Sequence, residues 1–184
     1  AFTMGASRRE PGRRANKTLR KTDLKRPFYL GTHEVSNEQY RKYAASHVSG
    51  TVQGNNLDGE KQPVVKVSWE QAVAYCNWLS KAESLEPFYK EINKKISGVN
   101  RSANGYRLPT EAEWAWSARV TGKNSLLKYP WGEQLPPTKK SGNYADTSSA
   151  GFLGKIIGNY NDGHMVSAPI GSFPANQRGL FDMG

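Results

Sequence analysis

Residues 105–114 read Gly-Tyr-Arg-Leu-Pro-Thr-Glu-Ala-Glu-Trp, and this run predicts a short strand, a stop and a capped helix start. Tyr106 and Leu108 alternate as in a strand, and the proline that follows disfavours helical angles in the residue before it. Thr110 and Glu113 have the spacing of a capping box. In that motif the hydroxyl accepts the backbone N–H three residues on, and the carboxylate accepts the N–H of the cap itself. We therefore expect a helix that begins directly after Thr110.

Two more helix starts carry the same pair of residue types. Ser36 precedes Gln39 by three positions, and Ser68 stands in the same relation to Gln71. Aromatic and apolar residues then recur at helical spacing after each cap. The faces predicted in this way are Tyr40, Tyr43, Ala44 and His47 for the first helix, and Trp69, Ala72, Val73, Cys76 and Leu79 for the second. We expect both helices to pack these faces on a core.

Short strands are predicted around the helices, at residues 28–35, 63–67 and 106–108. From Tyr129 onward, turn-forming runs such as Tyr-Pro-Trp-Gly and Asn-Asp-Gly replace periodic segments, which predicts an ordered but loop-rich last third. Residues 86–104 are polar and rich in lysine, and we interpret them as a surface insertion. Together these patterns indicate an α+β fold with short strands, about three helices and much irregular structure.

The positive charge of the chain is concentrated at its beginning. The 184 residues suit one domain, and their formal net charge is +10. Residues 1–26 contain nine of the 26 basic residues but only two acidic ones, Glu10 and Asp23. The basic residues of this segment are Arg8, Arg9, Arg13, Arg14, Lys17, Arg20, Lys21, Lys25 and Arg26. We expect an extended, solvated arm over residues 1–26 and a folded domain over residues 27–184.

Several runs resemble, in order and spacing, the formylglycine-generating sulfatase-modifying enzymes and their relatives. The matching runs begin at Met4-Gly5 and extend to the end of the chain. They include Phe28-Tyr29-Leu30-Gly31, Glu34-Val35-Ser36-Asn37, Val67-Ser68-Trp69, the run 105–114, Tyr129-Pro130-Trp131-Gly132, Asn143-Tyr144-Ala145 and Gly179-Leu180-Phe181-Asp182-Met183. The resemblance implies the C-type-lectin-like fold of that superfamily, with the domain 27–184 incomplete at its carboxyl end.

The resemblance also bears on redox chemistry. In the members that oxidise a sulfatase cysteine to formylglycine, two cysteines hold copper. By resemblance these cysteines follow a Gly-Asn-Val-x-Glu-Trp segment that would begin at Gly184. The one cysteine of this chain, Cys76, corresponds instead to a helix cysteine and falls on an apolar face. We interpret Cys76 as a small buried hydrophobe rather than a reactive thiol, so these 184 residues are not expected to perform that oxidation.

A calcium site is the strongest site hypothesis. By resemblance, one calcium ion of the family binds an Asn side chain, the next carbonyl, an Asp carboxylate and the carbonyl two residues on. The corresponding positions here are Asn143, Tyr144, Asp162 and His164. Such a set of oxygen ligands on irregular loops suits calcium. The alternative is that Asn143 and Asp162 only form turns, as these residue types do.

Other chemistry finds less support in the sequence. Glu111 and Glu113 lie two apart on the predicted helix, so they do not face each other, and a structural role in the first turn is favoured. The three histidines are scattered, and the His-x-x-x-His-x-Glu run of the iron-dependent relatives is absent. Trp114 follows the capping box closely and is expected in the core.

These patterns lead to two hypotheses of different classes. The first is a calcium-stabilised, extracytoplasmic domain that acts as a non-catalytic binding or assembly module for a protein or peptide. The second is the front part of a copper-dependent oxidoreductase whose paired cysteines lie beyond Gly184. The basic arm can also attract anionic surfaces. Nucleic-acid binding is the weakest alternative, because the arm lacks interleaved aromatic residues and a known reading motif.

Overall fold

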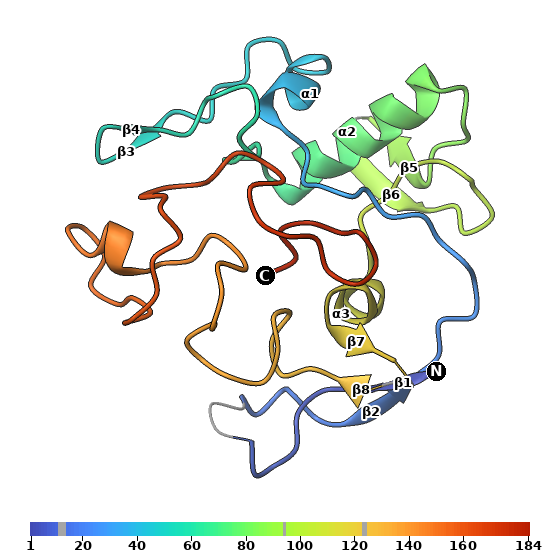
Figure 1. The fold of residues 1–184 in the computed structure, drawn as a ribbon. Helices are drawn as coiled ribbons and strands as arrows, with labels where there is room; N and C mark the ends of the chain where they lie inside the picture. The colour runs from blue at the N-terminus through green and yellow to red at the C-terminus, as the bar shows by residue number, and fades with distance from the viewer. Residues whose placement is uncertain (11–13, 94, 123–124) are drawn as a thin grey trace. The chain divides into compact units, whose positions relative to one another are not determined.

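The computed structural model separates the chain into two compact units, which are described one at a time (Figure 1). The first unit is formed by residues 1–34 and 109–184, and the second by residues 35–108. The structure describes residues 1–10, 14–93, 95–122 and 125–184. Within these residues, short two-stranded sheets and three α-helices are joined by long irregular segments, as expected of the α+β class.

The helix predicted after Thr110 is confirmed in the first unit. Helix α3 spans Glu111–Arg119 and begins with both bonds of the capping box. The backbone N–H of Glu113 donates to the Thr110 hydroxyl at 3.2 Å, and the Thr110 N–H donates to the Glu113 carboxylate at 2.8 Å. Glu113 is buried, so its carboxylate has the structural role that its position predicts. Ala115 and Ala118 are buried on the face of α3 that meets the core.

The basic N-terminal segment contains a β-hairpin rather than only an extended arm. Strand β1 (Phe2–Met4) pairs antiparallel with β2 (Arg20–Thr22). Phe2 and Met4 are buried and form one core cluster with Ala115 and Val120. Figure 1 shows the hairpin beside α3 and β8, consistent with their contacts. The expectation of a solvated arm missed the apolar alternation Phe2-x-Met4, which is too short to identify a strand without its partner. Arg13 lies outside the described residues.

The rest of the first unit is largely irregular, as predicted. A second small hairpin, β7 (Val120–Thr121) with β8 (Ser125–Leu126), follows α3. Beyond it, the 3₁₀ helix η1 (Thr147–Ser149) is the one helical element of the described residues 127–184.

The two tryptophans of α3 differ in how far they are covered. Trp114 is 38% exposed, so its predicted place in the core is wrong. Trp116 is half-buried, with its ring edge-on to Phe28 and the Arg178 guanidinium 4.0 Å above its ring centre. The cap sets where α3 begins, but which face of the helix is covered depends on segments far away in the sequence.

The second unit contains the other two capped helices. Helix α1 spans Asn37–Arg41 and α2 spans Trp69–Ala82, and both begin with the predicted capping boxes. Tyr40 and Val73 from the predicted faces are buried. The small hairpins of this unit are β3 (Thr51–Val52) with β4 (Asn55–Asn56), and β5 (Tyr89–Ile92) with β6 (Lys95–Val99).

The three predicted strands are wrong. Residues 28–35, 63–67 and 106–108 have no strand assignment, apart from an isolated bridge between Ser36 and Pro63. Side chains rather than a neighbouring strand bind the backbone of the last segment. The Tyr106 N–H donates to the Ser80 hydroxyl at 2.8 Å, and the Leu108 N–H donates to the Tyr89 hydroxyl at 3.1 Å.

The longest hairpin instead occupies the predicted surface insertion. Tyr89 of β5 is buried against Val73 and Cys76 of α2. Asn77 of α2 holds the same strand, since its amide donates to the Tyr89 carbonyl at 3.0 Å. Residues 86–104 therefore contribute one buried aromatic residue to the core, although most of their side chains are polar.

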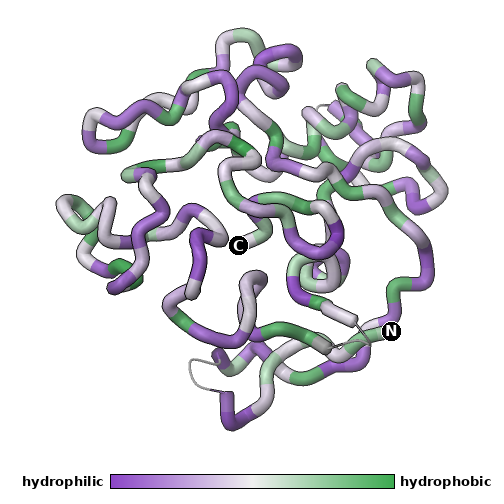
Figure 2. Tube along the Cα trace, viewed as in Figure 1, coloured by the Kyte–Doolittle hydropathy of each residue, from purple (hydrophilic) through white to green (hydrophobic). Residues whose placement is uncertain are grey.

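Hydrophilic and hydrophobic residues alternate over short stretches throughout the described chain (Figure 2). None of the helices in these residues combines the length and the apolar content that crossing a membrane requires.

The capping box of α3 gives a first prediction. Thr110→Ala removes the acceptor of the Glu113 N–H and the donor to its carboxylate. We expect the free energy of unfolding to fall by about 1 to 2 kcal/mol, measured by chemical denaturation. Thr138→Ala, at an exposed threonine, is the control and should leave stability unchanged. Equal effects of the two substitutions would contradict a stabilising cap.

The N-terminal hairpin gives a second prediction. Gly5 has a φ of +106°, and a Cβ at this position would collide with the backbone carbonyl of Thr18. Gly54 has a φ of +75° but open space around it. Gly5→Ala should therefore lower the free energy of unfolding by more than about 3 kcal/mol, and Gly54→Ala by only about 1 kcal/mol. Denaturation curves that show the same loss for both would mean that the hairpin contributes little to the unit.

Candidate functional site

The four residues of the predicted calcium site come together around one carboxylate. Asp162 is 2% exposed, and its Oδ2 accepts the Tyr144 N–H at 2.8 Å and the Asn143 side-chain amide at 3.2 Å. Its Oδ1 accepts the His164 N–H at 2.7 Å. Residues 143–144 and 162–164 are thus joined through a single buried side chain.

The turn-forming alternative has direct support in this geometry. The bond from the His164 N–H to the Asp162 carboxylate spans two residues and is an Asx turn. The Asn161 side chain makes the same type of turn with the Gly163 N–H at 2.8 Å. The Asp162 side chain therefore stabilises the turn at residues 162–164. Binding of a cation would be a second role of the same carboxylate.

Asp146 is a second buried carboxylate in the same cluster, and the sequence analysis missed it. It is fully buried and accepts the Asp162 N–H, the Ser148 N–H and the Ser148 hydroxyl. Burial would raise the pKa of Asp146, but these hydrogen bonds outweigh burial and lower the pKa, so the group is ionised. Asp146 also caps η1 with Ser149 at the third position. Sequence reasoning sought Glu or Gln at that position and so passed over this cap.

Tyr160 and Lys140 attach the neighbouring segment to this cluster. The Tyr160 hydroxyl accepts the Ser141 N–H at 3.1 Å and donates to the Gly142 carbonyl at 2.7 Å. The Lys140 ammonium donates to the Asp162 carbonyl at 3.1 Å. Residues 140–142 are therefore fixed to the same loop that presents Asp162.

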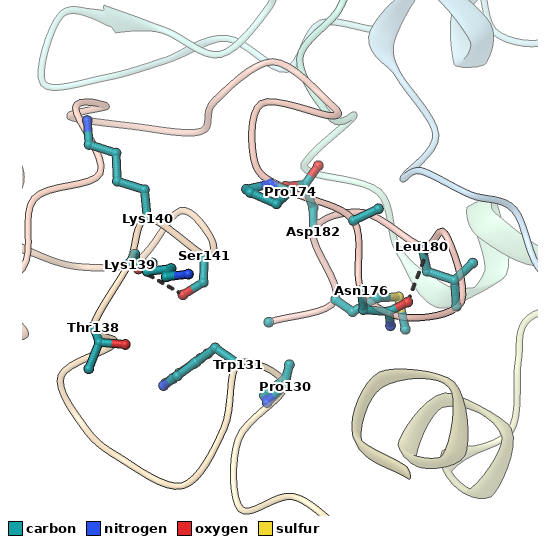
Figure 3. Close-up of a pocket in the computed structure, with 13 residues that line it drawn as sticks. Pro130, Trp131, Thr138, Lys139, Lys140, Ser141, Pro174, Asn176, Leu180 and Asp182 are labelled. Carbon is teal, nitrogen blue, oxygen red and sulfur yellow. Dashed lines mark hydrogen bonds between the residues drawn. The ribbon is translucent and has the colours of Figure 1, made fainter. Parts of the chain in front are cut away.

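A pocket of about 220 Å³ opens beside these residues (Figure 3). One side is formed by Thr138–Ser141 and the ring of Trp131, and Pro174, Asn176 and Asp182 lie on the other side. Trp131 is held by a parallel stack on Tyr129, with ring centres 4.8 Å apart, and its indole N–H donates to the Gln134 carbonyl. The pocket combines apolar walls with lysine, hydroxyl and amide groups, which suits a ligand that is partly polar.

The residues of the cluster fit a calcium ion in their chemistry. Asn143 and Asp162 supply an amide and a carboxylate, and Tyr144 and His164 supply carbonyls, all hard oxygen ligands on irregular loops. Asp146 and Asp162 are both buried, and the Asp146 carboxylate accepts the backbone N–H of Asp162, so two acidic residues belong to one group of loops. Because only the carbonyl of His164 is required, an imidazole at this position does not conflict with calcium.

Cys76 lies on the buried face of α2, in contact with Val73 and Tyr89. Burial raises the pKa of its thiol to about 11, so the thiol is protonated at neutral pH. This environment agrees with the interpretation of Cys76 as a buried hydrophobic residue.

Glu34 and Asp182 form a separate carboxyl pair, in which burial and the neighbouring Asp182 raise the pKa of Glu34. Glu111 is exposed and accepts from Lys17 at 3.3 Å and Arg20 at 3.2 Å, so it acts in ion pairs. His33 stacks on Phe181, with ring centres 4.3 Å apart. Among the residues that the structure describes, no three His, Cys, Asp or Glu side chains form a group that could hold a metal.

The predicted cation site leads to a thermal test. If calcium binds this cluster, saturating calcium should raise the melting temperature of the parent protein by about 5 to 10 °C relative to chelator. Asp162→Ala removes the central carboxylate and should abolish this gain.

Asp58→Asn is the matched control. Asp58 also accepts a backbone N–H, from Ser49 at 2.7 Å, but it belongs to the second unit. This variant should keep the full calcium response even if its own stability falls. A parent protein that melts at one temperature in both conditions would remove the calcium hypothesis.

The environment of Cys76 leads to a reactivity test. With a thiol pKa of about 11, the native protein should react with iodoacetamide at pH 8 about 100-fold more slowly than the denatured protein. The native rate should rise with pH as the thiolate forms. Fast native alkylation, followed by mass spectrometry, would show an accessible thiolate instead.

Comparison with known proteins agrees with the fold and the resemblance. The sequence profile of the sulfatase-modifying factor enzyme 1-like domain matches residues 1–184. The chaperone protein LppX of Paenibacillus barcinonensis is 30% identical over 175 residues, which cover 85% of this chain and 58% of LppX. The formylglycine-generating enzyme of Mus musculus is 35% identical over 127 residues, which cover 69% of this chain and 26% of that enzyme.

A solved structure supports the same architecture. PvdO from Pseudomonas aeruginosa superposes with a TM-score of 0.64 at 23% identity, over 99% of this chain and 63% of PvdO. The expected α+β fold of the formylglycine-generating-enzyme type is thereby confirmed. The chain spans less than two thirds of the length of each of these three proteins.

Proposed function

The chain belongs to the sulfatase-modifying factor enzyme 1-like family. We propose that it acts as a module that is stabilised by calcium and binds a protein or peptide segment. The observation that carries this proposal is the link between the Asp162 cluster and the pocket. Lys140 lines the pocket and also donates to the Asp162 carbonyl. A cation at Asp162 would thus hold one wall of the pocket in place.

The chemistry of the pocket supports a peptide ligand. Trp131, Pro130 and Pro174 offer flat apolar surfaces, while Ser141 and Asn176 offer hydrogen bonds. Ordered loops on a compact support are a common way to present such a binding surface. The bond network of Tyr160 and Asp162 keeps the loop backbone in one conformation, which lowers the entropic cost of binding.

A non-catalytic role fits the state of Cys76. A protonated, buried thiol neither attacks a substrate nor binds a metal readily. The relative LppX is described as a chaperone, which is a binding function. Calcium sites of extracellular modules match the high calcium levels outside the cytoplasm, so we also propose an extracytoplasmic location.

The alternative is a part of a copper-dependent oxidase that converts a sulfatase cysteine to formylglycine. The 35% identity to the formylglycine-generating enzyme of the mouse favours it. This alternative requires paired cysteines that follow Gly184 in the full protein. Incubation of the protein with copper, dioxygen, a thiol reductant and a cysteine peptide should then produce an aldehyde, whereas a binding module should produce none.

The binding role can be tested with peptides displayed on phage. Peptides selected on the protein in calcium should lose about tenfold in affinity for Trp131→Ala, because the ring forms a pocket wall. The control Trp69→Ala removes a tryptophan that is 52% exposed in the second unit and should leave the affinity unchanged. Failure to select any peptide, or equal effects of both variants, would argue against this pocket as the binding site.

A further inference from the structure

The N-terminal hairpin presents a dense group of exposed cations on the first unit. Pairing of β1 with β2 continues through the bond from the Ala6 N–H to the Lys17 carbonyl, so these two residues extend the hairpin. The hairpin surface is defined here by the exposed residues Arg8, Arg9, Arg14, Lys17, Arg20 and Lys21, together with Leu19 and Trp114. Residues 11–13 are not included in it.

Two exposed apolar side chains lie among these cations. Leu19 is 58% exposed and stands between Lys17 and Arg20, both of which bond to Glu111 of α3. Trp114 is 38% exposed and lies three residues after Glu111, on the same face of α3. The ion pairs at Glu111 therefore connect the segment 17–20 to α3, the helix that carries Trp114.

The side of the hairpin that carries Phe2 and Met4 is buried. Phe2 and Met4 pack into the core with Ala115 and Val120. The hairpin is thus anchored through Phe2 and Met4, while Lys17 and Arg20 reach Glu111 of α3 with side chains that stay exposed. This arrangement makes the charged surface a fixed feature of the fold.

We propose that the hairpin surface docks on an anionic lipid membrane. Lysine and arginine are drawn to the negative potential of anionic headgroups. Tryptophan and leucine next to them gain from entry into the interfacial region, where an amphipathic surface keeps its charges in water. A nucleic acid would satisfy the cations but would leave Leu19 exposed, so the mixture of side chains favours lipid.

Vesicle sedimentation tests this docking. The protein should sediment with vesicles of phosphatidylcholine that contain about one third phosphatidylglycerol, but not with pure phosphatidylcholine. Binding should fall as salt is raised, because exposed charges are screened. Chelator is present throughout, so that calcium neither bridges protein to lipid nor links this test to the peptide-binding proposal.

Two variants of the hairpin surface separate its charged and apolar parts. Arg9→Gln with Lys21→Gln should weaken vesicle binding about 25-fold, at about fivefold for each charge. Leu19→Ser with Trp114→Gln should weaken vesicle binding at least about fivefold while leaving retention on heparin unchanged. The matched controls are Lys90→Gln with Lys95→Gln, and Ile92→Ser, all on exposed positions of the β5–β6 hairpin. They should bind vesicles like the parent protein.

Three results would overturn the proposal. The first is no sedimentation with the anionic vesicles. The second is tight binding to heparin or single-stranded DNA without any to vesicles, which would assign the surface to nucleic acid. The third is vesicle binding that is insensitive to Leu19→Ser with Trp114→Gln, since the apolar side chains would then not meet the lipid. Circular dichroism of each variant confirms that it is folded.

Discussion

Irregular backbone can be buried only if its N–H and carbonyl groups find partners, and in the last third of this chain side chains supply many of them, beside backbone bonds such as that from the Ile157 N–H to the Ala145 carbonyl. Asp146, Tyr160, Asp162 and Asn176 each bind two or more backbone groups. Asn176 also reaches across to α3, where its amide donates to the Ser117 carbonyl at 2.9 Å. This satisfaction of backbone polarity by a few buried or half-buried side chains is the constraint on which the loops, the pocket and the Asp162 cluster all depend.

The same constraint places negative charge inside the unit. Carboxylates are strong acceptors for backbone N–H groups, and their hydrogen bonds offset much of the cost of burying them. The Asp146 carboxylate accepts the backbone N–H of Asp162, and the Lys140 ammonium donates to the Asp162 carbonyl. A site that already tolerates buried carboxylates and presents carbonyls nearby is suited to a hard divalent cation. The same carboxylates thus stabilise the loops and, in our proposal, contribute to calcium binding.

Features governed by neighbours in the chain were predicted well. The three capping boxes involve residues three positions apart, so their hydrogen bonds follow from the sequence alone. The four residues of the candidate cation site were identified through a family resemblance, and the structure brings them together.

The strands were predicted poorly. The run 106–108 has the alternation of a strand. Its backbone N–H groups nevertheless donate to the hydroxyls of Ser80 and Tyr89, and so it does not pair with a neighbouring strand.

The sequence by itself determined where the helices begin, that the last third is rich in turns, and that positive charge gathers near the N-terminus. Only the tertiary structure decided that the basic N-terminal segment contains a hairpin and that Trp116 is covered more than Trp114. The same holds for the hydrogen bond from the Asp162 N–H to the Asp146 carboxylate. The physical reason is range. Caps and turns are closed by bonds within a few residues, whereas burial and strand pairing depend on which distant segment supplies the partner.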